Sequence, residues 1–63
     1  MYTIIDTVSN SPVFNVIAPN GKEALMRFVE VRDLRADYEI REENGEWTMS
    51  NVWGSKFVAV KQE

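Results

Sequence analysis

The sequence contains no cysteine and no histidine among its 63 residues. Without cysteine, the chain cannot form a disulfide or bind zinc through thiolates, which argues against a disulfide-stapled secreted scaffold. Without histidine, it lacks the commonest metal ligand and the usual proton-transfer group near neutral pH. No window approaches eighteen consecutive apolar residues, and no basic segment precedes an apolar run at the N-terminus, so we expect neither a membrane span nor a signal peptide. We therefore interpret the protein as cytoplasmic.

Glycine is scarce as well, with only Gly21, Gly45 and Gly54 present. A helix start or a turn explains each of them. They form neither a phosphate-binding loop nor a dinucleotide fingerprint, and the chain carries no nucleophile elbow and no zinc pattern. We predict no cofactor and no metal site.

The composition is that of a folded chain of modest size. Hydrophobic residues make up 44% and charged residues 27%, which is too apolar for a disordered protein. A length of 63 residues predicts one small domain, near the lower limit at which a single core is stable.

One segment has a clear helix start signal and a helical apolar stripe. Asn20 suits an N-cap, and Glu23 lies three residues further on, where it faces the positive end of the helix. Leu25, Phe28 and Val29 then fall on one face, together with Arg32, whose aliphatic stem can extend over the edge of a core. We predict a helix over about 20–33, ending between Val31 and Arg35.

Apolar and β-branched segments lie on both sides of this helix. They predict strands at about 2–8, 13–18, 36–42, 47–52 and 56–61. A turn cluster ending at Pro12 joins the first two strands into an antiparallel hairpin. The predicted fold is a single α+β domain of order ββαβββ, in which one helix packs on an antiparallel sheet of four to five short strands.

Asn44-Gly45 is the clearest local signal after the helix. This pair favours a two-residue type I′ turn, because both residues must adopt positive φ. Such a turn sets Glu43 opposite Glu46 and Ile40 opposite Met49. It also places four apolar residues on one face of the sheet: Tyr38, Ile40, Trp47 and Met49.

Gly54-Ser55 suggests a second two-residue turn. With that turn, Val58 and Val60 share the face of Met49, while Phe57 and Ala59 share the opposite face with Val52. One helix can cover only one face, so the second apolar face is partly covered, or the register is shifted by one residue, or the face is a contact surface.

Carboxylates are the only abundant residues with catalytic potential. Catalysis needs carboxyl groups that face each other across a cleft, whereas a hairpin tip is convex and solvated. The same acids with Asn44 do not follow the spacing of a calcium-binding loop. We predict that the protein is not an enzyme and that the acids form a solvated tip: Asp37, Glu39, Glu42, Glu43 and Glu46, beside Arg41.

Aromatic residues are concentrated in the last part of the chain, where Trp47, Trp53 and Phe57 lie close to Lys56 and Lys61. Aromatics on a sheet can stack nucleic-acid bases, but a net charge of −3 opposes phosphate binding and is too small for a convincing DNA mimic. Burial of all three aromatics would exclude direct stacking.

These exclusions favour a non-catalytic protein-interaction module. We expect its contact surface to include an exposed sheet edge and the apolar residues Val52, Trp53, Phe57 and Ala59. Trp53, beside a tight turn, is the best candidate for a binding hot spot. The partner is a second copy of the chain or another protein, and the alternative is a small accessory protein acting on or near nucleic acid.

Overall fold

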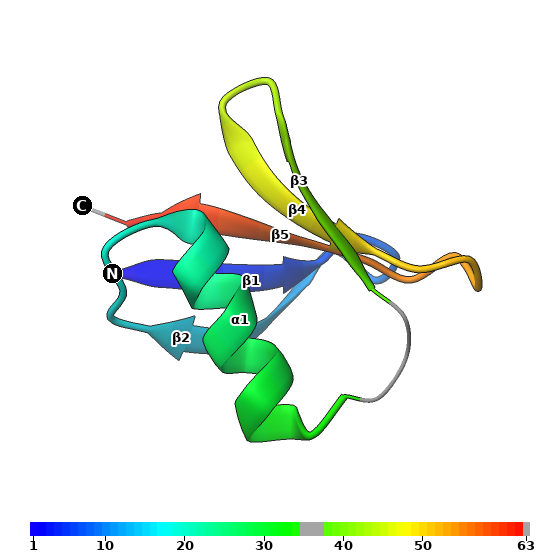
Figure 1. Ribbon diagram of the computed structural model, residues 1–63, viewed down its shortest axis with the longest axis horizontal. Helices are drawn as coiled ribbons and strands as arrows, with labels where there is room; N and C mark the ends of the chain where they lie inside the picture. The colour runs from blue at the N-terminus through cyan, green and yellow to red at the C-terminus, as the bar shows by residue number, and fades with distance from the viewer. Residues whose placement is uncertain (35–37, 63) are drawn as a thin grey trace.

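The computed structural model describes residues 1–34 and 38–62. One helix packs on one face of a five-stranded antiparallel sheet (Figure 1), which confirms the predicted α+β fold of order ββαβββ. The sheet order is β2-β1-β5-β4-β3, so the last strand inserts between the two hairpins. The elements are β1 Tyr2–Asp6, β2 Ser11–Val16, α1 Gly21–Arg32, β3 Glu39–Glu43, β4 Glu46–Ser50 and β5 Lys56–Lys61.

Helix α1 begins and ends at polar caps. The side chain of Asn20 accepts a hydrogen bond of 2.9 Å from the backbone N–H of Glu23, as the sequence predicts. At the other end Asp33 adopts a left-handed conformation with φ 51°, and the N–H of Leu34 bonds the carbonyl of Val29 at 3.1 Å. This reversal terminates the helix after Arg32.

The β1–β2 hairpin turns earlier than predicted. β1 ends at Asp6 rather than at residue 8, because the Asp6 carboxylate accepts a hydrogen bond of 2.9 Å from the N–H of Val8 and starts the turn. β2 therefore runs from Ser11 to Val16 instead of 13–18. Pro12 lies opposite Ile5 in this edge strand, beside an irregularity in the register, where its missing N–H costs no ladder bond.

The β3–β4 hairpin has the predicted turn and register. Asn44 and Gly45 adopt positive φ of 52° and 84°, and Glu43 pairs with Glu46 while Ile40 pairs with Met49. β3 begins at Glu39, and β4 ends at Ser50 rather than at residue 52. The predicted strand start at residue 36 falls on 35–37, outside the described residues.

The predicted pairing of β4 with β5 is wrong. A two-residue turn at Gly54-Ser55 would pair Met49 with Val60, whereas the structure pairs Met49 with Phe57. Relative to the predicted pairing, the partner of Met49 is displaced by three residues along β5. A displacement by an odd number of residues moves every side chain of β5 to the other face of the sheet. The cause is a five-residue loop between Ser50 and Lys56. Phe57 and Ala59 therefore face the helix.

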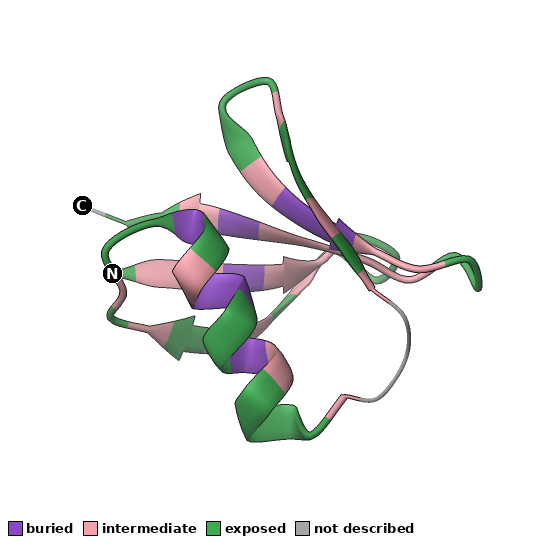
Figure 2. Cartoon of the chain, viewed as in Figure 1, coloured by how far each residue is buried: buried purple, intermediate pink, exposed green. Residues whose placement is uncertain are grey.

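The core lies between α1 and the three central strands (Figure 2). Ile4, Leu25 and Met49 are fully buried at its centre. Four tilted aromatic rings extend it along the helix, with centroid separations of 5.5, 5.1 and 6.1 Å between successive members: Phe14, Phe28, Phe57 and Tyr38. Apolar contact between the helix stripe and this row holds the two layers together.

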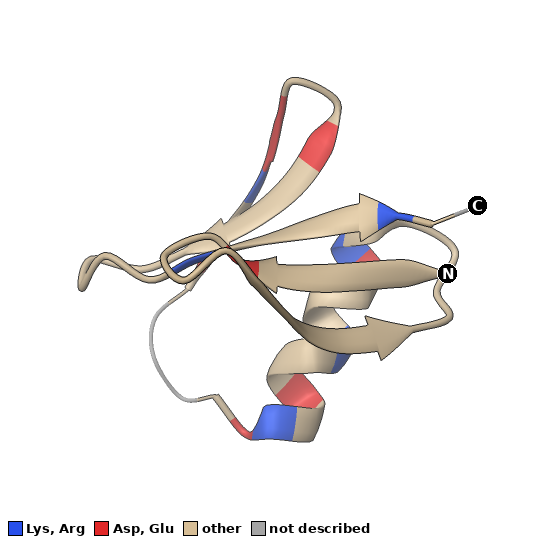
Figure 3. Ribbon diagram, turned by 180° about the vertical axis from the view of Figure 1, so that it is seen from behind, with Lys and Arg blue, Asp and Glu red and all other residues tan. Residues whose placement is uncertain are grey.

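The other face of the sheet has no covering element in the described part of the chain. Ile5 pairs with Val58, and Val58 also pairs with Thr48. Seen from this side in Figure 3, charges concentrate on the β3–β4 hairpin, while β1 and β2 carry few. Ile5, Val58 and Val60 are half-buried by their cross-strand neighbours, so this face is a narrow apolar stripe.

Candidate interaction site

The loop from Asn51 to Ser55 has a defined internal structure. The side-chain oxygen of Asn51 accepts hydrogen bonds from the N–H groups of Trp53 at 3.0 Å and Ser55 at 3.1 Å. The backbone N–H of Asn51 donates to the Ser55 carbonyl at 3.1 Å. Gly54 adopts φ 96°, a conformation that side chains disfavour. One asparagine thus closes the loop at both ends.

This loop presents two large apolar side chains to solvent. Val52 is 88% exposed and Trp53 is 84% exposed, the highest values among the exposed large hydrophobic residues. The loop extends past the end of the sheet, beyond β4 and β5 in Figure 1. A tryptophan held outward in this way offers much apolar area to a partner.

The four residues predicted as one contact surface do not lie together. Val52 and Trp53 occupy the exposed loop, but Ala59 is a buried core residue and Phe57 packs in a tilted arrangement against Phe28, with ring centroids 5.1 Å apart. The register of β5 separates them, because it turns Phe57 and Ala59 toward α1. The candidate site therefore reduces to the tip of loop 51–55.

The aromatic residues are divided in the same way. Trp47 and Phe57 are half-buried on the helix side of the sheet, whereas Trp53 is exposed. Lys56 does not join a basic surface, since its amine bonds the Glu43 carboxylate at 3.1 Å. The described residues of the uncovered face include no aromatic side chain, so no row of rings is available there for base stacking.

The acidic residues of the hairpin are dispersed and paired with cations or solvated. Glu39 pairs with Arg41, and Glu43 with Lys56, while Glu42 and Glu46 are exposed. Asp37 lies outside the described residues. Within residues 1–34 and 38–62, no group of three potential ligands gathers to hold a metal ion.

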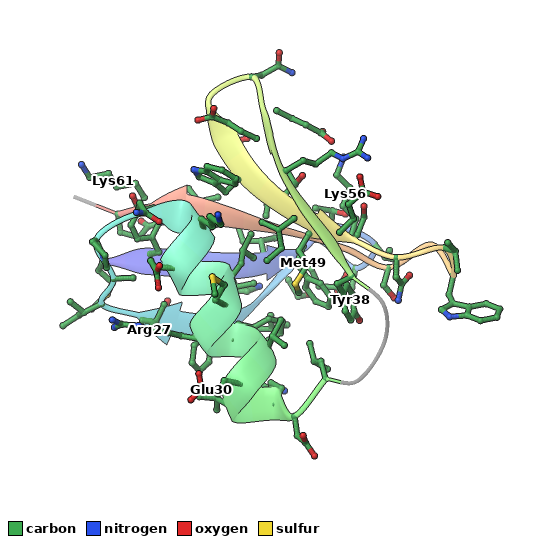
Figure 4. The ribbon with its side chains drawn as sticks, viewed as in Figure 1. Arg27, Glu30, Tyr38, Met49, Lys56 and Lys61 are labelled. Atoms are coloured by element: carbon green, nitrogen blue, oxygen red, sulfur yellow. The ribbon has the colours of Figure 1, made fainter. Side chains whose placement is uncertain are left out.

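A groove between α1 and β3 was not predicted from the sequence. It has a volume of about 400 Å³ and six lining residues: Met26, Val29, Glu30, Tyr38, Ile40 and Met49. Figure 4 shows Tyr38 and Met49 between the helix and β3, and Glu30 on the helix. The sequence signal was Met26, an apolar residue outside the core stripe, which is 46% exposed.

Comparisons of the chain with protein-family models, curated proteins and solved structures found no match. In the described residues, no helix has the length and apolar character needed to cross a membrane.

Proposed function

We propose that the protein is a non-catalytic interaction module that binds another protein through the tip of loop 51–55. The observation that supports this most directly is the exposure of Trp53, at 84%, on a loop that Asn51 closes by side-chain hydrogen bonds. Tryptophan is strongly enriched among residues that dominate binding energy.

The structure of the loop makes such binding less costly. A contact must offset the conformational entropy that its groups lose on binding, and a preformed loop loses little of this entropy. Asn51 fixes the backbone on both sides of Trp53, because its side chain bonds Trp53 and Ser55. Val52, next to it and 88% exposed, adds apolar area.

The nucleic-acid alternative has less support. The aromatic residues other than Trp53 in the β4–β5 region face the helix, and Lys56 is paired with Glu43. Base-stacking surfaces combine several aromatics with unpaired cations. A single exposed tryptophan on a chain of net charge −3 fits an apolar protein contact better.

The proposal is tested with the immobilised full chain and three variants. Wild type, Trp53→Ala, Val52→Ala and the control Ile17→Ala are compared for proteins retained from a lysate, after circular dichroism has shown equal folding. Ile17 is a suitable control because it is an exposed apolar residue, at 72%, far from the loop in sequence. We expect a protein retained by wild type and Ile17→Ala, weakened by Val52→Ala and lost with Trp53→Ala.

Self-association is measured separately by sedimentation velocity over about a hundredfold concentration range. A dimer that Trp53→Ala abolishes would assign the loop to a second copy rather than to another protein. Equal retention by wild type and Trp53→Ala, together with a monomer at every concentration, would refute the assignment of loop 51–55. Labelled single-stranded DNA whose binding depends on Trp53 would favour the nucleic-acid alternative instead.

A further inference from the structure

We propose that edge strand β3 and the groove beside it bind an extended, basic and apolar peptide segment of a partner protein as a sixth strand. This surface is separate from the tip of loop 51–55, and the proposal does not depend on that loop. Four features support it: the free backbone groups of β3, the partial obstruction of the other sheet edge, the apolar groove and the charge of β3.

The hairpin register shows which backbone groups of β3 are free. In a two-residue hairpin, the residues flanking the turn exchange both backbone hydrogen bonds, and so does every second pair along the ladder. Glu43 and Glu46 flank the turn. Arg41 and Glu39 therefore also bond β4, while the N–H and C=O groups of Ile40 and Glu42 face away from it. β3 is an edge strand, so these groups can pair with a further strand.

The opposite edge of the sheet, β2, is less able to accept a strand. The guanidinium of Arg32 donates to the Val13 carbonyl of β2 at 2.8 Å, and that of Arg27 donates to the carbonyl of Ile17, the residue after the end of β2. Pro12 has no N–H to offer, and the register is irregular beside it. Arginine caps, proline and an irregular register all obstruct strand addition, so β3 is the more open edge.

The groove can bury apolar side chains of an added strand. A residue opposite Ile40 would share its face of the sheet, which is the face toward α1. There the groove of about 400 Å³ is lined by Met26, Val29, Tyr38 and Met49 besides Ile40. This volume accommodates aliphatic side chains, so backbone pairing and apolar burial can occur together, as in other strand-addition sites.

The charge of β3 selects the partner. Three of the five residues of β3 are acidic, Glu39, Glu42 and Glu43. Arg41 pairs with Glu39 and Lys56 of β5 pairs with Glu43, so Glu42 is the acid of β3 for which the described residues show no cation. Glu30 is the one charged residue among the described residues that line the groove. A second copy of β3 would bring like charges together, which destabilises cross-strand pairs, whereas lysine or arginine would pair favourably. The expected occupant is therefore a basic strand from another protein.

The register also predicts a probe sequence. In an antiparallel strand whose first residue lies opposite Glu43, the first two residues should be basic, and those opposite Ile40 and Tyr38 should be aliphatic. We choose acetyl-Lys-Arg-Thr-Val-Thr-Ile-amide and titrate it into the uniformly ¹⁵N-labelled full chain. We expect the largest amide shifts at Ile40 and Glu42, with binding detectable below about 2 mM, a range usual for a short unoptimised contact.

Modified peptides test the pairing without altering the protein. An N-methyl group on the valine removes the N–H that would bond the Ile40 carbonyl, and we expect at least about tenfold weaker binding. The matched control carries N-methyl on the second threonine, whose N–H would face away from β3, and should bind nearly as well as the unmodified peptide. Replacing Lys-Arg with Glu-Glu should also weaken binding about tenfold, through repulsion from Glu42 and Glu43.

The outcomes separate this proposal from the one on loop 51–55. Trp53→Ala should bind the probe as wild type does. The proposal fails if no β3 amide shifts, if the shifts map to β2 or loop 51–55, or if both methylated peptides bind equally. Shifts of Ile40 and Glu42 that appear on concentrating the protein alone would assign the edge to a second copy and overturn the proposed partner.

Discussion

Gly21 lies against the indole of Trp47, and this contact joins the first turn of α1 to the start of β4. A Cβ added at Gly21 would lie 3.0 Å from Trp47 Cδ1 and 3.1 Å from Trp47 Cβ. Gly21 is buried, and Lys22 next to it places its amine 5.9 Å from the Trp47 ring centre. The glycine thus permits close packing of helix on sheet, beyond its role at the helix start.

We expect Gly21→Ala to destabilise the protein by about 1 kcal/mol. Alanine has the higher helix propensity, but overpacking a close contact usually costs 1–3 kcal/mol, and Trp47 Cβ cannot move without its backbone. The measurement is urea denaturation of wild type and Gly21→Ala. In a double-mutant cycle with Trp47→Leu, the cost should fall only in part, because leucine removes the indole contact but keeps the Cβ contact. A stabilised Gly21→Ala variant would contradict the close contact.

The register of β5 predicts unequal effects at two adjacent positions. Phe57→Leu removes a ring that packs against Phe28 and Tyr38 and should cost about 1–2 kcal/mol. Val58→Thr, on the uncovered face, should cost about half as much or less. Thermal melts suffice, since 1 kcal/mol shifts the midpoint of so small a domain by about 4–8 °C. A larger loss of stability in Val58→Thr than in Phe57→Leu would support the two-residue turn at Gly54-Ser55.

Local signals in the sequence predicted those features that neighbouring residues determine. Asn20 caps the helix because its side chain reaches an N–H three residues away, and Asn44-Gly45 sets a turn because these residues tolerate positive φ. Each depends on only a few consecutive residues. The β3–β4 register followed directly from the turn, and so did the shared face of Ile40 and Met49.

The β4–β5 register was not predictable in the same way, because it depends on a loop closed by a side chain and on a contact that is distant in the sequence. The side chain of Asn51 closes a five-residue loop through two hydrogen bonds. A two-residue turn at Gly54-Ser55 would not need these hydrogen bonds. Packing of Phe57 against Phe28, 29 residues earlier, then favours one face of β5 over the other. The groove between α1 and β3 is likewise formed by segments that are separate in the sequence, so Met26 stands out as an apolar residue outside the core stripe, but the sequence does not show what lies beside it.

The two tryptophans should differ clearly in solvent access. Trp47 is half-buried beside Gly21, while Trp53 is 84% exposed. In Trp47→Phe, the remaining Trp53 should fluoresce at longer wavelength and be quenched by acrylamide several-fold more strongly than Trp47 in Trp53→Phe. Equally weak quenching in the two variants would show that the tip of loop 51–55 is covered, and would remove the main support for the proposed function.

Arg32 should contribute modestly to stability despite its exposure. Its guanidinium donates to the Val13 carbonyl at 2.8 Å and lies 5.6 Å from the centre of the Phe28 ring. We expect Arg32→Met, which keeps the aliphatic stem, to cost about 0.5–1 kcal/mol by urea denaturation. Arg32→Lys should cost less than Arg32→Met. If Arg32→Met leaves the free energy of unfolding unchanged, only the aliphatic stem of Arg32 contributes to stability.

Asn51 should couple the stability of loop 51–55 to binding by Trp53. Asn51→Ala removes an acceptor shared by two N–H groups and should cost about 1–2 kcal/mol. Asn51→Asp keeps the acceptor and serves as the matched control. In Asn51→Ala the Trp53 amide should become more mobile by ¹⁵N relaxation, and the partner retained by wild type should be bound more weakly, because the loop must then be ordered on binding. Weaker binding by Asn51→Ala with unchanged Trp53 mobility would contradict this mechanism. Equal binding by Asn51→Ala and Asn51→Asp would show that the hydrogen bonds of Asn51 do not prepare the loop for its partner.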